Sequence, residues 1–280
     1  MRTERLVIGV VATLGIVALI TWLGLPAALR AAGLHPQYDI PPFDLSGRRA
    51  LIVATNQATL GESGKPTGVF ASELTIPYFA FQDAGMQVDI ASPKGGIVPV
   101  EPSSMRWPLA TRADRRFKGD VAAMRKLDIS LRVSELDASD YDIVFLAGGW
   151  GAAYDLGQSL DLGEFVTQAN AQGTVIGGVC HGPLGLLQAK DIDGNPLVQG
   201  RALTAVSDAQ VEQLGIEFTP LHPETELRKA GALYESETAF RDMFATRVVV
   251  DGNLVTGQNQ NSGAETAHRM MDLVNGKQPN

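Results

Sequence analysis

The chain begins with one long apolar run. Leu6 to Leu29 are 24 residues without a charged side chain, between Arg5 and Arg30. At about 1.5 Å per residue in a helix, the part before Pro26 already spans the roughly 30 Å hydrocarbon core of a bilayer. An uncleaved transmembrane anchor is therefore predicted for residues 1–30. The alternative is a cleaved signal peptide, but the apolar region of such peptides is only about 7–15 residues long, and Arg30 interrupts the small residues of a cleavage site.

The charges around the apolar run favour one orientation. Arg2, Arg5 and the terminal amine precede the run and Arg30 follows it. This asymmetry predicts an inside N-terminus and a domain on the exported side. Arg48 and Arg49 reduce the asymmetry, so the orientation stays open.

Beyond a proline-containing linker at residues 31–46, short apolar runs alternate with segments of helical periodicity over residues 47–280. Buried strands are predicted at 49–55, 86–91, 142–147 and 174–179, with a strand pair at 247–250 and 253–256. Helices are predicted at 67–84 and 160–171 and from about residue 264, and further elements at 201–206 and 223–230. Strands that alternate with helices indicate an α/β sandwich with a mainly parallel sheet.

Composition excludes some partners. The 280 residues carry a net charge of −8 and a pI near 5.0, with 45% hydrophobic and 19% charged residues. Nucleic acid is therefore not expected as a partner, because the only basic run, Arg112 to Lys118, is short and is typical of a solvated helix face. The single cysteine, Cys180, excludes an intrachain disulfide.

That cysteine lies in Gly178-Val179-Cys180-His181-Gly182, directly after the apolar run 174–179. The spacing is the cysteine version of a nucleophile elbow, in which a strand turns sharply into a helix and flanking glycines prevent collisions. A helix N-terminus favours the thiolate, and His181 could hold the proton. The alternative is that Cys180 is a small buried hydrophobe.

Glu73 falls within the apolar stripe of the helix predicted at 67–84, three residues after Phe70 and four before Pro77. A carboxyl group facing the core has a raised pKa, which suits proton transfer near neutral pH. The alternative is a flank residue whose carboxylate reaches water.

The segment Gly148-Gly149-Trp150-Gly151 follows the strand predicted at 142–147. Glycines at the carboxyl end of a parallel strand let backbone N–H groups approach a ligand oxygen. With the N–H of His181, that of Gly148 or Gly149 is predicted to form an oxyanion hole. Alternatively, the glycines form only a tight turn.

Together these residues resemble the ThiJ/PfpI superfamily, which has the class I glutamine amidotransferase-like fold. The similarity runs from about Leu45 to Val274 and is closest to the branch of glutathione-independent glyoxalases and stress chaperones. It rests on six segments in order, which are Thr67–Leu74, Ala91–Gly96, Asp140–Asp142, Gly148–Gly151, Cys180–Pro183 and Val250–Asn259. The resemblance implies a flavodoxin-like three-layer sandwich, a nucleophile at Cys180 with His181 as its partner, Asp208 as the acidic partner of His181, and Glu73 as a buried glutamate that hydrogen-bonds the nucleophile.

The chain departs from the family pattern in places. Trp150 stands where many relatives carry histidine, and Ala147 replaces a common proline; an aromatic side chain there is expected to narrow the substrate pocket. The four histidines, His35, His181, His222 and His268, have no ligand spacing. No metal or other cofactor is therefore expected, and His222 is predicted to start a helix.

The resemblance implies a cysteine-dependent enzyme that converts methylglyoxal and similar 2-oxoaldehydes to 2-hydroxy acids such as D-lactate. Cys180 would form a hemithioacetal, Glu73 and His181 would move protons through an ene-diol, and Asp208 would orient His181. A related hydrolase, deglycase or amidotransferase-like enzyme, or a membrane-tethered holding chaperone, remains the alternative. The expected partners are a small carbonyl compound and the membrane, and a homodimer is left open.

Overall fold

The computed structural model describes residues 2–31, 38–215, 218–239 and 245–276. The chain divides into two units, Met1–Gln37 and Tyr38–Asn280, each described by itself. The described residues of the first unit form a single helix, α1 (Arg2–Ala31). Its stretch Val7–Leu25 has 19 residues with a mean hydropathy of 2.3, none of them buried, so it is long and apolar enough to cross a membrane. A signal sequence would have the same properties.

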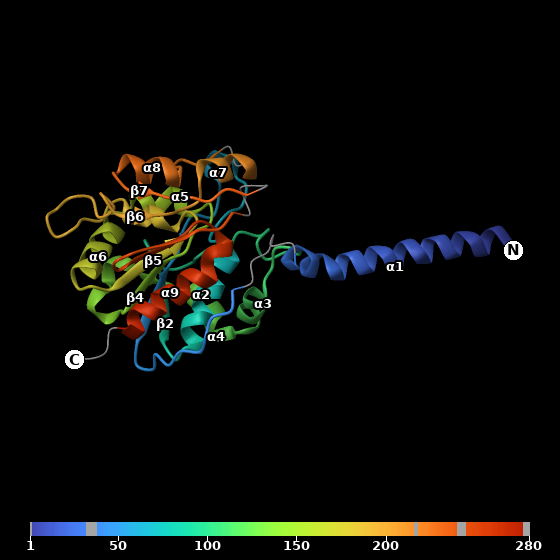
Figure 1. Cartoon of the computed structure of the whole chain (residues 1–280), viewed down its shortest axis with the longest axis horizontal. Helices are drawn as coiled ribbons and strands as arrows, with labels where there is room; N and C mark the ends of the chain where they lie inside the picture. Colours follow the sequence, from blue (N-terminus) through green and yellow to red (C-terminus); the bar gives the residue numbers. More distant parts are fainter. Residues whose placement is uncertain (1, 32–37, 216–217, 240–244, 277–280) are drawn as a thin grey trace. The chain divides into compact units, whose positions relative to one another are not determined.

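The second unit is built on a seven-stranded sheet with the order β3-β2-β1-β4-β5-β9-β8 (Figure 1). All neighbours are parallel except β8 and β9, which form the predicted antiparallel pair. A smaller parallel sheet pairs β6 with β7. The strands are β1 (Arg49–Val53), β2 (Gln87–Ser92), β3 (Leu131–Arg132), β4 (Ile143–Leu146), β5 (Val175–Val179), β6 (Ala202–Leu203), β7 (Leu233–Tyr234), β8 (Val248–Asp251) and β9 (Leu254–Gly257).

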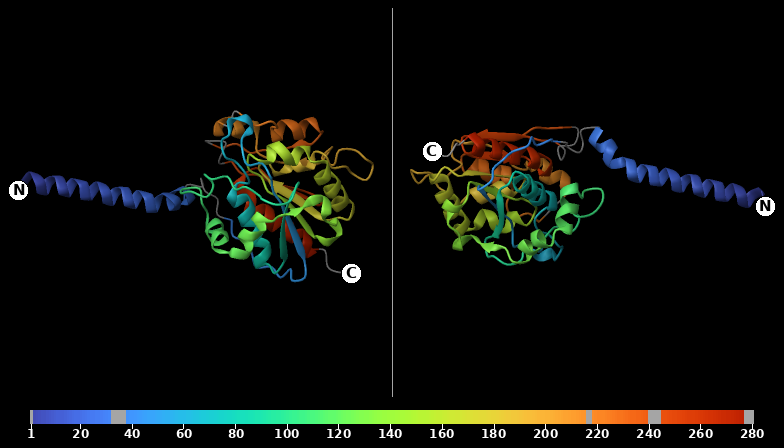
Figure 2. Two further views of the ribbon diagram at one scale, coloured as in Figure 1. Left: turned by 180° about the vertical axis from the view of Figure 1, so that it is seen from behind. Right: turned by 90° about the horizontal axis from the view of Figure 1, so that it is seen from below.

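Helices cover both faces of the large sheet, which gives three layers (Figures 1 and 2). Helices α2 (Ala71–Asp83), α3 (Arg112–Gly119), α4 (Val121–Asp128) and α9 (Gly263–Gly276) contribute to one apolar core, and α5 (Ala152–Asp155) and α6 (Leu160–Ala171) to the other. Two further helices, α7 (Asp208–Leu214) and α8 (Pro223–Lys229), follow β6. Short 3₁₀ turns are η1 (Gly61–Ser63), η2 (Val133–Glu135), η3 (Ala138–Asp140), η4 (Leu156–Gln158), η5 (Gly182–Leu186) and η7 (Gln260–Ser262).

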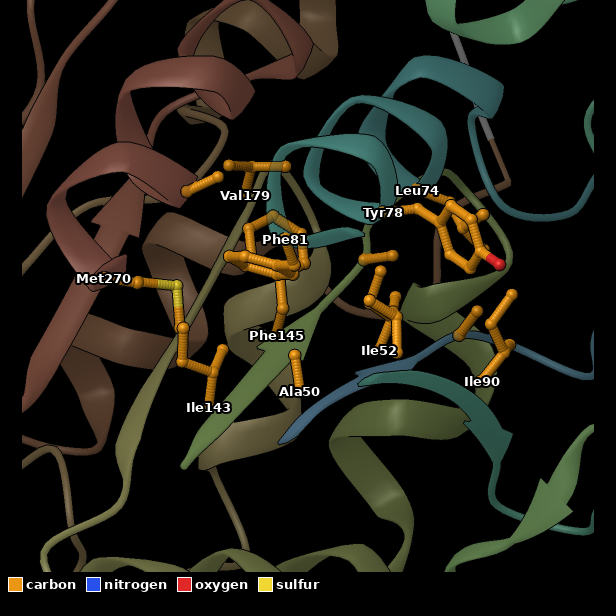
Figure 3. Packing of buried hydrophobic residues seen from close by; sticks show 14 of the residues in the cluster. Ala50, Ile52, Leu74, Tyr78, Phe81, Ile90, Ile143, Phe145, Val179 and Met270 are labelled. Atoms are coloured by element: carbon orange, nitrogen blue, oxygen red, sulfur yellow. The ribbon is translucent and has the colours of Figure 1, made fainter. Parts of the chain in front are cut away.

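The core between the sheet and helices α2 and α9 fixes the position of α2. Figure 3 shows Phe81 of α2 above Phe145 of β4, with Met270 of α9 beside them. The two phenyl rings pack edge to face with their centroids 6.2 Å apart. Phe81, Phe145 and Met270 are fully buried. Such contacts hold α2 against the sheet and thereby fix the residues of its first turn.

Helix α2 begins four residues later than its periodicity predicts. Residues 67–70 are not helical, because Val69 pairs with Val100 in an isolated parallel bridge. The N–H of Ala71, the first helical residue, donates to the buried hydroxyl of Ser104 at 3.0 Å. This bond from a distant loop sets the start of the helix, and the sequence pattern of the helix itself does not contain it.

The order of the strands predicts a crevice at the carboxyl ends of the central strands. Apart from the two-residue edge strand β3, the parallel strands counted along the chain lie in the order 2-1-3-4-5, as in flavodoxin-like folds. In such sheets the connections leave toward opposite faces at the point where the order reverses, here between β1 and β4. The segments that follow β4 and β5 contain the glycine motif and the cysteine. The predicted site therefore lies at the carboxyl ends of these strands.

Candidate active site

Cys180 occupies the sharp turn after β5 and has the backbone conformation of a nucleophile elbow. Its φ of 59° is the one positive value at a non-glycine residue in the described part of the chain. A Cβ atom at Gly178 would lie 2.3 Å from the carbonyl oxygen of Leu146, and one at Gly182 would lie 2.0 Å from the same atom. Both glycines are required for this close approach to β4, as the sequence predicts.

The thiol of Cys180 is not activated as the sequence suggests. The turn leads into η5, a five-residue 3₁₀ helix, so little helix dipole acts on the sulfur. The side chain is buried, and burial followed by the nearby carboxyl group of Glu73 raises the pKa of Cys180 well above its ordinary value of 9.0. The prediction of a lowered thiol pKa is wrong in direction, and the resting side chain is a thiol.

Glu73 is buried in the first turn of α2, with an exposed fraction of 1%. Its carboxyl group faces the thiol of Cys180 and the backbone N–H groups of Gly148 and Gly149. Burial is the largest influence and raises the pKa of Glu73 to about 8, although these hydrogen bonds oppose the rise. The inward orientation predicted from the apolar stripe is confirmed. A carboxyl group with this pKa can exchange a proton with the thiol near neutral pH.

Two backbone N–H groups face the sulfur of Cys180, those of Gly149 and His181. Gly149 has a φ of 99°, and a Cβ atom there would lie 2.4 Å from the backbone nitrogen of Phe70. At Gly148, a Cβ atom would lie 2.4 Å from Oε2 of Glu73. The glycine pair therefore lets the loop after β4 approach both the acid and the thiol. An oxygen bound to the carbon that Cys180 attacks would meet the same two N–H groups.

His181 is buried beside the thiol. Its Nδ1 atom lies 3.3 Å from Sγ of Cys180, while its Nε2 atom is buried without a hydrogen-bond partner. Burial, with a smaller contribution from His222, lowers the pKa of His181 to about 3, so the resting ring is neutral. Trp150 packs on this ring with a centroid separation of 4.6 Å.

Asp208, the first residue of α7, lies apart from His181. Its Oδ2 atom accepts a hydrogen bond from the Thr225 hydroxyl at 2.6 Å, and its Oδ1 atom lies 3.8 Å from Nδ1 of His222. Within the described residues, no hydrogen bond or ion pair joins Asp208 to His181. The role of Asp208 as the orienting acid stays a prediction.

His222 makes a contact that its sequence motif does not predict. It directly precedes α8 as predicted, and Pro223 occupies the first helical position. However, it also lies against Asp208 and influences the ionisation of His181. Asp208 and His222 come from separate segments, so no spacing along the chain could reveal their contact. Among the described residues, no group of three or more His, Cys, Asp or Glu side chains could hold a metal ion.

The raised thiol pKa gives a pH prediction. Because Cys180 is the single cysteine, its alkylation by iodoacetamide reports this thiol alone. The rate is expected to rise with pH with a midpoint above the roughly 8.5 of a free cysteine. Glu73→Gln removes the negative charge that disfavours the thiolate and should shift the midpoint downward. A midpoint below that of free cysteine in the unmodified chain would contradict this description of the site.

A positive-φ cysteine lies on a strand-to-helix turn of an α/β sheet, with a buried acid, a buried neutral histidine and two N–H groups around its sulfur, which is the geometry of a candidate cysteine-nucleophile site. The chain belongs to the DJ-1/PfpI family, whose model matches residues 66–273.

Three relatives illustrate the similarity. The chain is 31% identical to the glutathione-independent glyoxalase HSP31 of Saccharomyces cerevisiae over 220 residues, or 75% of this chain and 91% of the relative. It is 30% identical to the glutathione-independent glyoxalase hsp3102 of Schizosaccharomyces pombe over 244 residues, or 81% and 98%. The crystal structure of glyoxalase III from Candida albicans superposes with a TM-score of 0.73 at 27% identity, over 81% of this chain and 97% of that one.

Proposed function

We propose that this protein is a glutathione-independent glyoxalase of the glyoxalase III type, which converts methylglyoxal and similar 2-oxoaldehydes to 2-hydroxy acids such as D-lactate. The names of the relatives support the reaction. The observation that carries the proposal is the set of groups around the Cys180 sulfur. Glu73 and the His181 ring can exchange protons there, and two backbone N–H groups can donate to a substrate oxygen.

The first step adds Cys180 to the aldehyde carbon. A bond forms between sulfur and C1 while the thiol proton passes to Glu73 in its ionised form, which is the minor form below its pKa of about 8. The carbonyl oxygen gains negative charge and accepts hydrogen bonds from the N–H groups of Gly149 and His181. The oxygen then takes the proton that Glu73 received, and the product is a hemithioacetal. Because the thiol is protonated at rest, the neighbouring carboxylate is the group that makes this step feasible.

The second step moves hydrogen from C1 to C2. His181 is neutral and moves the C1 proton to the C2 oxygen, which gives an ene-diol bound to sulfur. The O1 proton then passes through His181 or Glu73 to C2, which gives a thioester of the 2-hydroxy acid. Water hydrolyses the thioester and restores the thiol. C1 is oxidised and C2 is reduced within one molecule, so the reaction needs no external oxidant and adds one water overall.

The reaction is tested by its mass balance. Full-length protein in detergent, incubated with methylglyoxal and no glutathione, is expected to produce lactate in the same amount as the aldehyde that disappears. Loss of aldehyde without lactate would contradict a glyoxalase and would indicate stable adducts. Release of an amine from a glycated peptide, with no lactate from methylglyoxal, would favour the related hydrolase.

We also propose that α1 anchors the enzyme in a membrane, with the catalytic domain on the exported side. Full-length protein is expected to pellet with membranes and to resist a high-salt wash, because the apolar span Val7–Leu25 is held by the hydrophobic effect rather than by charge. A matched variant with Leu14→Lys and Val17→Lys places two charges in the middle of the span and should release the protein, at a cost of about 3 kcal/mol per charge. Release of the unmodified protein by salt, or a mature N-terminus near residue 32, would contradict the anchor.

A further inference from the structure

The segment that forms α3 and the turn before it carries positive charge that the proposed reaction does not use. Four of its exposed side chains, called the basic surface below, are Arg106, Arg112, Arg115 and Lys118. None of the four has an ion-pair partner in the described part of the chain; Arg115 donates only to the carbonyl oxygen of Ala110. The whole chain has a net charge of −8, so this surface has the opposite sign to the protein.

The packing of α3 keeps these cations on the solvent side. Phe117 is buried, and the buried carboxylate of Asp114 accepts a 2.6 Å hydrogen bond from the Thr75 hydroxyl of α2. Arg116 pairs with Asp83 of α2 at 2.6 Å. Asp114 is the one acidic residue between residues 102 and 119, so no carboxylate of this segment neutralises the basic surface.

The turn before α3 adds apolar side chains to the basic surface. Trp107 and Leu109 are 40% and 44% exposed. The N–H groups of Leu109 and Ala110 both donate to the carbonyl oxygen of Arg106 at 2.9 Å, which holds the turn in shape. Tryptophan beside arginine and lysine is typical of a membrane interface, where the indole lies at the level of the headgroups and the cations meet lipid phosphates.

The chain enters the domain in the layer that contains α3. The hydroxyl of Tyr38 lies 2.5 Å from Nδ1 of His268 on α9, and the ring of Phe43 packs edge to face on the same imidazole. The N–H of Leu45 donates to the carbonyl oxygen of Ala84, at the end of α2. Helix α2 packs against both α9 and α3 (Figure 1). The tether and the basic surface therefore belong to the same layer of the domain.

The chain between α1 and this layer is short. Six residues, 32–37, lie between the end of α1 and Tyr38. A chain of six residues reaches at most about 20 Å when it is fully extended. A bilayer that holds α1 therefore stays within reach of the domain, which raises the effective concentration of lipid at its surface and lets a weak contact form.

We propose that the basic surface, together with Trp107 and Leu109, docks on the anionic lipid headgroups of the bilayer that α1 enters. The inference rests on the proposed anchor and not on the glyoxalase reaction. Each basic residue near an anionic bilayer strengthens binding by about fivefold. The same bilayer repels the acidic remainder of the domain, so docking selects one orientation of the domain on the membrane.

The test follows the approach of Trp107 to the headgroups. The chain has three tryptophans, so the full-length variant Trp22→Phe/Trp150→Phe leaves Trp107 as the one fluorophore of this type. It is placed, one copy per disc, in nanodiscs of phosphatidylcholine or of phosphatidylcholine with phosphatidylglycerol, with a spin label on a fraction of the headgroups. Quenching of Trp107 is expected only with phosphatidylglycerol, and is expected to disappear at about 1 M salt, where charges are screened beyond about 3 Å.

Matched variants in this background separate the basic surface from overall charge. One removes three cations whose side chains have no hydrogen-bond partner among the described residues, Arg106→Gln, Arg112→Gln and Lys118→Gln. It is expected to lower the docking equilibrium by about 100-fold with an unchanged thermal midpoint. The control removes three exposed lysines of other elements, Lys65→Gln, Lys190→Gln and Lys229→Gln, and should change docking by less than about twofold. Equal quenching in both lipids, no quenching in either, or equal loss in the two variants would overturn the proposal.

Recovery of the protein with the nanodiscs tests the anchor separately. If the protein does not co-elute with the discs, the anchor fails, and quenching is measured with free vesicles of the same two compositions. Salt-sensitive quenching by the anionic vesicles alone would then support the basic surface, and its absence would overturn it. The formation of lactate from methylglyoxal is measured independently, so neither result decides the proposed reaction.

Discussion

Cys180→Ser is expected to reduce glyoxalase turnover by at least about 10³-fold while the fold remains intact. The hydroxyl group is close to the thiol in size, but it is far less acidic and a weaker nucleophile, so the bond to C1 does not form at a useful rate. Serine also tolerates the elbow as well as cysteine does, because the strain at φ 59° comes from the backbone and is common to both. Lactate production and the thermal midpoint are measured on the same preparation.

A second variant distinguishes loss of the nucleophile from local misfolding. Cys180→Ala removes the nucleophile without introducing a polar atom into a site that is 8% exposed. It should be as inactive as the serine variant. Retained turnover in either well-folded protein would remove Cys180 from the mechanism.

Glu73→Gln is expected to lower turnover by at least about 10²-fold and to leave the protein as stable or more stable. The amide keeps the size and the hydrogen-bonding reach of the carboxyl group but cannot accept the thiol proton. Because the folded-state pKa is about 8 and the ordinary value is 4.5, the carboxyl group favours the folded state fully below pH 4.5, and this contribution is lost as pH rises through 8. The loss is on the order of a few kcal/mol, so the variant should gain stability relative to the unmodified protein above pH 8.

The matched control is Glu164→Gln, at an exposed position of α6. It should change neither turnover nor the dependence of the thermal midpoint on pH. If Glu73→Gln behaved like Glu164→Gln, the carboxyl group would have no part in the chemistry. If both the activity and the stability of the variant collapsed together, Glu73 would be a structural residue.

Structural features that depend on residues close together in the sequence were predictable. The elbow at Cys180 follows from Gly178 and Gly182, because the close approach to Leu146 leaves no room for a side chain. The inward position of Glu73 follows from its place in the apolar stripe of α2. The helix α3 (Arg112–Gly119) is indeed a mostly exposed basic helix, as its composition indicates.

Features that depend on distant contacts were not predictable. The start of α2 depends on a hydroxyl from Ser104, 33 residues away. The pKa of Cys180 was expected to fall because a helix follows the elbow, but the helix is a short 3₁₀ turn and burial beside a carboxyl group dominates. His222 carries a clear helix-start signal, and only the packing of α7 and α8 brings it to Asp208.

The central claim is that the product forms as a thioester on Cys180. Full-length protein is mixed with ¹³C-labelled methylglyoxal, quenched within a single turnover and digested, and the peptide that contains Cys180 is analysed by mass spectrometry. The account predicts a lactoyl group on this peptide that hydroxylamine removes, and whose formation and decay match the rate of lactate release. Lactate that appears at the same rate with no such group on Cys180 would contradict it.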